Sequence, residues 1–164
     1  MNDHSRTRKP LRLKGHDYAT AGAYFLTICT ANRQPLLWTH VGAAISRPDE
    51  IPLSAAGQIV DTAIRQIPEI YPAVRLDKYC IMPDHVHMIL FIDADEHGRQ
   101  IAAPTVSTVI GQMKRWVSLQ TGFPVWQKSF VDRIIRNEQA YLAVWEYIDN
   151  NPLRPDTGED IFII

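Results

Sequence analysis

The segment HVHMILFI, residues 85 to 92, constrains the fold more than any other part of the chain. It is rich in apolar and β-branched residues, which predicts a β-strand packed within a sheet. Side chains of a strand alternate between its two faces, so His85 and His87 point to one face while Val86 and Met88 point to the other. We therefore expect a strand with one dry face and one face that carries two imidazoles.

Further strands are predicted on either side of this one. Residues 73 to 82, AVRLDKYCIM, form a strand, and Pro83 with Asp84 can turn or bulge the chain before His85. Two strands joined so tightly pair antiparallel. Residues 23 to 30, AYFLTICT, form an earlier strand, and a short later one lies within residues 125 to 137.

Apolar residues at helical spacing predict three helices between and after these strands. Their expected limits are a cap at Ser54 with a stop near Pro68 to Pro72, a run from about Thr105 to before Gly122, and a cap at Asn137 with a stop at Pro152. The order β-α-β-β-α-β-α predicts an α+β fold, a ferredoxin-like or RRM-like antiparallel sheet with helices packed on one face.

Charge and composition limit the partners and the setting of this chain. The 164 residues carry 17 Lys and Arg against 18 Asp and Glu, so a nucleic acid would have to be bound by local patches. The two cysteines lie in apolar runs, which favours a reducing cytoplasm over a disulfide framework. We expect a basic arm at residues 1–17 that is no signal peptide, one domain at 18–155, a tail at 156–164, and no membrane span.

The histidine pair is a candidate metal site. Side chains two residues apart on one strand face lie close enough for both rings to bind one cation. The alternative is a polar sheet face open to solvent. The remaining histidines lie in polar segments and are expected at the surface: His4, His16, His40 and His97.

The last helix supplies two more candidates. Its core-facing stripe is expected to comprise Tyr141, Val144, Trp145 and Ile148. Tyr147 lies roughly 110° from the centre of that stripe, at about 100° per residue, and Asn151 follows one turn later on the same flank. The Asn151 amide oxygen is a hard ligand for Mg²⁺ or Mn²⁺, so the combination with the histidines predicts a site. Taken singly, Tyr147 could be a half-buried amphipathic residue and Asn151 a helix-end residue.

The chain resembles the REP-associated tyrosine transposases, members of the single-tyrosine, His-hydrophobe-His (HUH) transposase superfamily of insertion sequences. The likeness covers nearly the whole chain. It runs through RLKGHDYATAGAYFLTICTANRQPLL, then YCIMPDHVHMILFI, and then PVWQKSFVDRIIRNEQAYLAVWEYIDNNPLRP. These three segments in that order are far more specific than any one of them.

The resemblance implies roles for four residues. His85 and His87 would bind a divalent cation, Tyr147 would be the nucleophile, and Asn151 would complete the metal site. The activity implied is cleavage and joining of single-stranded DNA, often beside a hairpin or repeated palindrome, through a 5′-phosphotyrosine intermediate and without ATP. The family commonly has Asn where this chain has Asp84, and the added charge is expected to shift metal affinity or repel a phosphate.

The resemblance also implies the partners and leaves alternatives open. Single-stranded DNA, a bacterial cytoplasm with its nucleoid, and a monomer or homodimer are expected. The candidate DNA-binding residues are Arg8, Lys9, Arg12, Lys14, Arg33, Lys114, Arg115, Lys128, Arg133 and Arg136. Trp38, Trp116 and Trp126 either stack on bases or pack in the core. The competing functions are a non-catalytic RRM-like nucleic-acid-binding module and a metal-dependent hydrolase that uses water in place of Tyr147.

Overall fold

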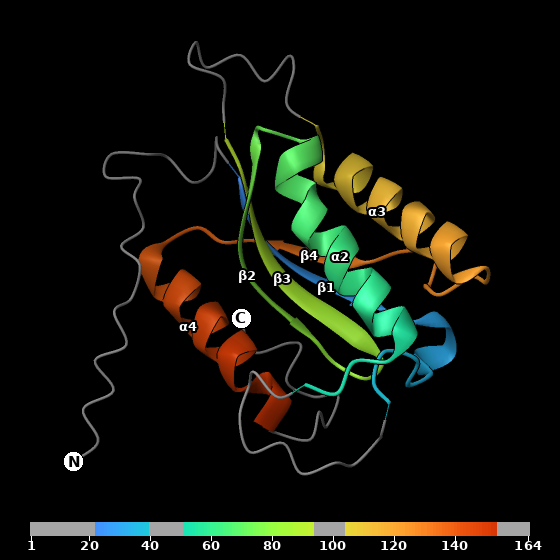
Figure 1. Ribbon diagram of the computed structural model, residues 1–164. Helices are drawn as coiled ribbons and strands as arrows, with labels where there is room; N and C mark the ends of the chain where they lie inside the picture. Colours follow the sequence, from blue (N-terminus) through green and yellow to red (C-terminus); the bar gives the residue numbers. More distant parts are fainter. Residues whose placement is uncertain (1–21, 40–50, 94–103, 154–164) are drawn as a thin grey trace.

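A computed structural model describes residues 22–39, 51–93 and 104–153 of the chain (Figure 1). The predicted strands and helices are all found within these ranges. In chain order they are β1 (Ala23–Cys29), η1 (Ala31–Arg33), α2 (Ala55–Ile70), β2 (Val74–Ile81), β3 (His85–Ile92), α3 (Val106–Thr121), β4 (Val131–Ile134), α4 (Glu138–Asn150) and η3 (Asn151–Leu153). The predicted arm and tail lie outside the described residues. Among the residues that the structure describes, no helix is long and apolar enough to cross a bilayer.

The four strands form one antiparallel sheet in the order β2-β3-β1-β4. The connection through α2 carries the chain from β1 to β2 and leaves a gap between them, which β3 then fills. This is the split βαβ arrangement of ferredoxin-like folds. The predicted α+β class and antiparallel sheet are therefore confirmed.

Helices α2 and α3 cover one face of the sheet, as expected (Figure 1). On that face Val86, Met88 and Leu90 of β3 are fully buried. They share a core with the apolar sides of the two helices, where Ile64 and Ile110 are also inaccessible to solvent. This face is the dry face that the alternation in residues 85 to 92 predicts.

Helix α4 lies on the opposite face of the sheet, so the expectation that all helices pack on one face is wrong for this helix (Figure 1). Tyr141 of α4 packs its ring against Phe91, which has the same parity along β3 as the histidines. The physical reason is that β3 is buried at seven of its eight positions, so its second face also needs a cover.

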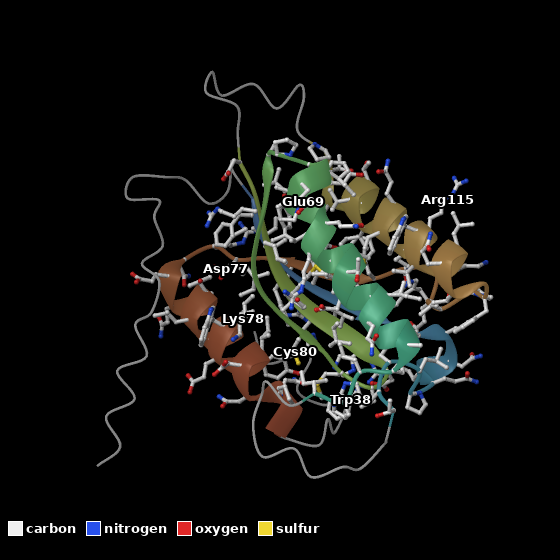
Figure 2. All side chains as sticks on the ribbon, in the orientation of Figure 1. Trp38, Glu69, Asp77, Lys78, Cys80 and Arg115 are labelled. Carbon is white, nitrogen blue, oxygen red and sulfur yellow. The ribbon has the colours of Figure 1, made fainter. Side chains whose placement is uncertain are left out.

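Side chains at a bulge in β2 bind α4 to the edge of the sheet. The pairing with β3 shifts between Leu76 and Lys78, so Asp77 and Lys78, labelled in Figure 2, both reach α4. Asp77 accepts a 2.5 Å hydrogen bond from the hydroxyl of Tyr141. Lys78 forms a 2.7 Å ion pair with Asp149, and its ammonium lies 4.3 Å from the centre of the Trp145 ring. The stripe on α4 is as predicted, except that Trp145 is only half-buried and Asp149 is buried instead.

The helix caps follow the sequence prediction. Ser54 accepts a hydrogen bond from the amide of Gly57, and Asn137 caps α4 by accepting from the amide of Ala140. Gly122 ends α3 in the left-handed conformation, with φ of 81°. These local signals fix where the helices begin and end.

Gly57 allows the N-terminus of α2 to approach the loop after β1. The Ser54 side chain and amide bond to the carbonyls of Leu36 and Leu37, and the Leu37 amide donates to the carbonyl of Pro83. A methyl group at Gly57 would overlap the backbone carbonyl of Leu37. The glycine is therefore required for this helix to pack on the loop that faces the turn before His85.

Gly57→Ala is predicted to destabilise the protein by about 1–3 kcal/mol, because the added methyl has no room and displaces backbone. Gly111→Ala in α3 is the matched control, since no atom lies within 4 Å of the methyl position. There the better helix propensity of alanine should stabilise by about 0.5–1 kcal/mol. Urea unfolding of the two variants measures both effects, and equal free energies of unfolding would contradict the packing argument.

Candidate active site

The two histidines of β3 lie side by side on the face that α4 covers. Both side chains are fully buried, and their ring centres are 4.6 Å apart. The predicted shared face is therefore confirmed, while the alternative of a sheet face open to solvent is wrong at these positions. Two buried imidazoles at this separation form a compact pair of candidate metal ligands.

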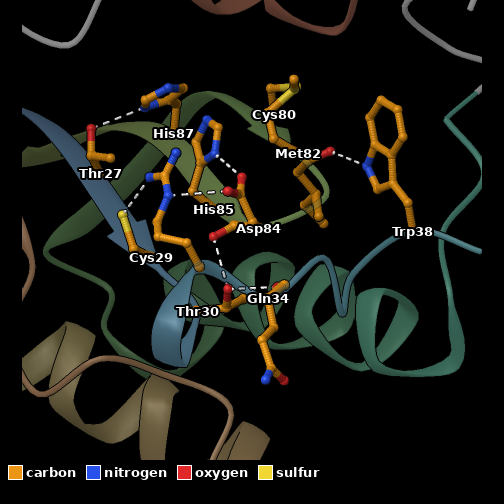
Figure 3. A network of polar contacts seen from close by, with 12 residues as sticks. Thr27, Cys29, Thr30, Gln34, Trp38, Cys80, Met82, Asp84, His85 and His87 are labelled. Carbon is orange, nitrogen blue, oxygen red and sulfur yellow. Dashed lines mark hydrogen bonds and ion pairs between the residues drawn. The ribbon is translucent and has the colours of Figure 1, made fainter. Parts of the chain in front are cut away.

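Each histidine ring is held through its Nδ1 atom by a different side chain (Figure 3). Nδ1 of His85 is 2.7 Å from Oδ1 of Asp84, and Nδ1 of His87 is 3.0 Å from the hydroxyl of Thr27 on β1. A partner at Nδ1 leaves Nε2 as the nitrogen that can coordinate a cation. The sheet register makes the second contact, because it pairs Thr27 with His87.

Tyr147 of α4 lies directly against His87. Its hydroxyl is 3.5 Å from Nε2 of His87, the two ring centres are 5.3 Å apart, and its ring makes a T-shaped contact with Phe25. The side chain is half-buried. The structure thus brings together a phenol and the histidine pair, which lie 60 residues apart in the sequence.

Asn151, one turn after Tyr147, is also buried, with 6% of its surface exposed. Its Oδ1 atom has no hydrogen-bond partner within the described residues. A buried carbonyl oxygen without a partner costs free energy, so its position calls for a ligand. An amide oxygen and imidazole nitrogens are both ligands that suit a divalent cation of intermediate hardness.

Asp84 contacts His85, as Figure 3 shows, and it also contacts Arg33 on the loop after β1. Oδ2 of Asp84 is 3.0 Å from Nε of Arg33, whose Nη1 donates a 3.0 Å hydrogen bond to the sulfur of Cys29. Arg33 and its neighbour Asn32 both have φ of 54°, in the left-handed region that non-glycine residues seldom adopt. The charge of Asp84 is therefore balanced within the protein.

The electrostatics of the site follow from its burial. Burial alone would raise the pKa of Asp84, but the hydrogen bond to His85 and the charges of His85 and Arg33 outweigh it, so this pKa is lowered and the carboxylate is ionised. Burial, followed by repulsion from His85 and Arg33, holds the pKa of His87 well below its usual 6.5. A neutral His87 has a lone pair for a metal at neutral pH.

The cysteines are closer to the histidines than their place in the sequence indicates. The register pairs Cys29 with His85 and Cys80 with His87. Burial, however, raises the pKa of the Cys80 thiol to about 12, so this sulfur stays protonated and is a poor metal ligand. No group of three or more His, Cys, Asp or Glu side chains converges on a metal position anywhere in the described residues.

The candidate DNA-binding residues are spread over different surfaces. Arg33 belongs to the network around Asp84. Arg133 of β4 pairs with Phe25 of β1, which places Arg133 on the face of the histidines. The ammonium of Lys114 bonds to the backbone carbonyls of residues 127 to 129, and burial lowers its pKa. Exposed positions are occupied by Arg115, which projects from α3 in Figure 2, and by Lys128 and Arg136. The remaining four, Arg8, Lys9, Arg12 and Lys14, lie outside the described residues.

The tryptophans considered for base stacking belong mainly to the core. Trp38 and Trp126 are buried, and the Trp38 indole donates to the carbonyl of Ile81. Trp116 is half-buried and packs against the core. Core packing is therefore the correct alternative for Trp38 and Trp126.

Sequence reasoning missed the residues that hold the histidine rings. The sequence predicts a turn at Asp84 and an effect of its charge, and it marks Arg33 as a DNA contact. It predicts no contact between a histidine ring and Asp84 or Thr27. The adjacency of Asp84 to His85 is a usable signal, because neighbouring carboxylates often orient histidines. The Thr27 contact depends on strand register and carries no local signal.

Comparison with known proteins places this chain among relatives with the same architecture. It is similar to the REP-associated tyrosine transposase whose structure is known bound to a REP hairpin, with a TM-score of 0.60 and 21% identity over 81% of this chain and 67% of that chain. A Deinococcus radiodurans R1 protein proposed to be a transposase gives a TM-score of 0.50 and 17% identity, over 84% of this chain and 94% of that one. The fold is thus the α+β fold of these transposases, and the resemblance seen in the sequence is confirmed at the level of the fold.

The sequence relative is nearer than the structural ones. The chain is 33% identical over 165 residues to an uncharacterized protein of Haemophilus influenzae (strain ATCC 51907 / DSM 11121 / KW20 / Rd), covering 89% of this chain and 88% of that protein. This chain belongs to the same family as that protein. No protein-family model matches this chain.

The lowered pKa of His87 predicts a pH dependence of stability. Below about pH 6.5 the unfolded chain binds a proton that the native state does not. The free energy of unfolding therefore decreases as the pH is lowered, by at most about 1.4 kcal/mol per pH unit. His87→Asn should flatten this slope between about pH 6.5 and 5.5. Urea unfolding of both proteins across this range is the measurement, and an unchanged slope would show that His87 is readily protonated in the native state.

Proposed function

We propose that this protein is a metal-dependent single-stranded DNA endonuclease and strand transferase. Tyr147 would be the nucleophile, and His85, His87 and Asn151 would hold a divalent cation. The observation that supports this most directly is the 3.5 Å approach of the Tyr147 hydroxyl to Nε2 of His87, within a transposase fold. His87 and Tyr147 meet within one chain, so this part of the proposed site needs no second subunit.

The reaction proposed is an in-line displacement at phosphorus. The Tyr147 oxygen, after giving up its proton to solvent, attacks the scissile phosphate; a tyrosine–phosphorus bond forms, and the bond from phosphorus to the 3′ oxygen breaks. This leaves a 5′-phosphotyrosine and, once the leaving oxygen takes a proton from solvent, a free 3′-OH. The phosphoester energy is conserved in the intermediate, so attack by a 3′-OH reverses the step and joins strands.

The residues around Tyr147 support this chemistry. The Tyr147 ring contacts both His87 and Phe25, which limits the orientations of the phenol. An ordinary tyrosine has a pKa near 10, so the site must help it ionise. A bound cation would polarise the scissile phosphate and stabilise the charge of the transition state.

Mg²⁺ or Mn²⁺ is the cation that the proposed ligands favour. Two imidazoles with one amide oxygen leave further positions for water and phosphate oxygens, as these ions require. A closed structural zinc site would need thiolates, and the Cys80 thiol is protonated. Burial of both rings also keeps the coordinating nitrogens out of water.

The substrate proposed is single-stranded DNA beside a hairpin or repeated palindrome, in the bacterial cytoplasm. Arg133 lies on the face of the histidines and could neutralise a phosphate near Tyr147. A net charge of −1 fits binding at local contacts. The alternative of a non-catalytic RRM-like module is less well supported, because the aromatic residues Phe25 and Phe91 on this sheet face are buried.

Tyr147→Phe is predicted to abolish a covalent adduct between the protein and labelled single-stranded hairpin DNA in the presence of Mn²⁺. The adduct is detected as a labelled band that survives denaturation. Tyr71→Phe is the matched control, because that hydroxyl bonds to Gln112 of α3, on the opposite face of the sheet. Cleavage that persists in Tyr147→Phe without any adduct would favour the hydrolase that uses water.

His85→Asn and His87→Asn should each lower the yield of adduct at limiting Mn²⁺ by at least ~10-fold, since each removes a proposed ligand. Asparagine is preferred to alanine because both rings are fully buried, and alanine would leave a cavity. Circular dichroism and thermal melts check the fold. Full adduct formation by both variants, over the same Mn²⁺ titration, would rule out the histidine pair as the metal site.

A further inference from the structure

We propose that Asp84 is a positioning residue that fixes the tautomer and orientation of His85 for a cation, and that Arg33 acts on the site through Asp84. The inference rests on the proposed function and deepens it. Asp84 is also the position where this chain carries a charge in place of the asparagine common in the family it resembles. The geometry gives that charge a specific use.

The contact to His85 determines which nitrogen faces the site. The carboxylate can only accept, so the 2.7 Å contact from Oδ1 of Asp84 requires a hydrogen on Nδ1 of His85. The lone pair then resides on Nε2, where a cation would bind. Because the His85 side chain is fully buried, its ring has little room to rotate once this hydrogen bond is made.

The contact to Arg33 uses the other carboxylate oxygen. Oδ2 of Asp84 meets Nε of Arg33 at 3.0 Å, so the two oxygens have separate partners and the carboxylate plane is fixed from both sides. Arg33 is held in turn by its bond to the sulfur of Cys29, which pairs with His85 across the strands. The pairing with Arg33 also compensates the negative charge that would otherwise repel a phosphate.

The backbone around this pair is fixed as well. The Asp84 carbonyl accepts from both the amide and the hydroxyl of Thr30, at 2.9 and 3.0 Å. Arg33 reaches Asp84 from a left-handed backbone conformation, φ of 54°, that costs free energy and persists only where the surroundings maintain it. Strain of this kind beside a buried histidine is typical of a site that needs a fixed geometry.

The two histidines are held differently, which makes the effect of Asp84 separable. His87 is oriented by the neutral hydroxyl of Thr27, whereas His85 is oriented by a carboxylate. A hydrogen bond to an ionised acceptor is stronger than one between neutral groups. Loss of the Asp84 side chain should therefore affect the orientation of His85 more than that of His87.

The first experiment reads the tautomer of His85 in the metal-free protein, by long-range proton–nitrogen NMR at neutral pH. Wild type should carry its hydrogen on Nδ1. Asp84→Asn, which keeps an acceptor oxygen, should retain that tautomer, whereas Asp84→Ala should lose it or show a mixture. An unchanged tautomer in Asp84→Ala would overturn the proposal whether or not the protein cleaves DNA.

The second experiment measures Mn²⁺ binding by calorimetry without DNA. Asp84→Ala should weaken binding about 10- to 100-fold, as is usual when a residue that orients a metal ligand is removed. Asp84→Asn should fall between that variant and wild type. Asp132→Ala, at an exposed carboxylate on β4, is the charge-matched control and should bind as wild type does.

A double-mutant cycle tests Arg33. Arg33→Gln should weaken Mn²⁺ binding in the wild-type background and have no further effect in the Asp84→Ala background, because it acts through the carboxylate. An equal effect in both backgrounds would overturn the role given to Arg33.

The outcomes separate this inference from the proposed function. Wild type that forms the DNA adduct while Asp84→Ala binds Mn²⁺ equally well would refute the positioning role alone. Wild type that binds no Mn²⁺ and forms no adduct would refute the proposed function, and the metal role of Asp84 with it.

Discussion

The structure depends on the pairing of β3 with β1 on one side and β2 on the other. This central strand is buried on both faces, so it needs one layer of helices over Val86, Met88 and Leu90 and another cover over His85 and His87. Helices α2 and α3 supply the first, and α4 lies over the second (Figure 1). Burying two imidazoles in this way is tolerated because each ring has a polar partner, Thr27 on β1 for His87 and the preceding residue Asp84 for His85.

The position of α4 is set largely by polar contacts at the sheet edge. The bulge in β2 directs Asp77 and Lys78 toward the helix, where they meet Tyr141 and Asp149. A half-buried ion pair and a half-buried hydrogen bond define the register of a helix along a strand more narrowly than apolar contacts do. That register carries Tyr147 over His87, so residues outside the site determine its geometry.

Charge is balanced locally around the site. The carboxylate of Asp84 lies between Arg33 and His85, and the strained turn at Asn32 and Arg33 makes this contact possible. Such pairing explains how a chain with a net charge of −1 can place an acidic residue beside a proposed phosphate-binding site.

The sequence alone determined the order of elements, the helix caps at Ser54 and Asn137, and the shared face of His85 and His87, because these follow from periodicity and local hydrogen bonding. It also marked Tyr147 and Asn151 as lying together on one helix flank. Only the tertiary structure decided that α4 covers the histidines, that Thr27 and Asp84 hold their rings, and that both cysteines lie opposite them. Except for the contact between the neighbours Asp84 and His85, these contacts join segments distant in the sequence, and they depend on strand register and a bulge that no local pattern specifies.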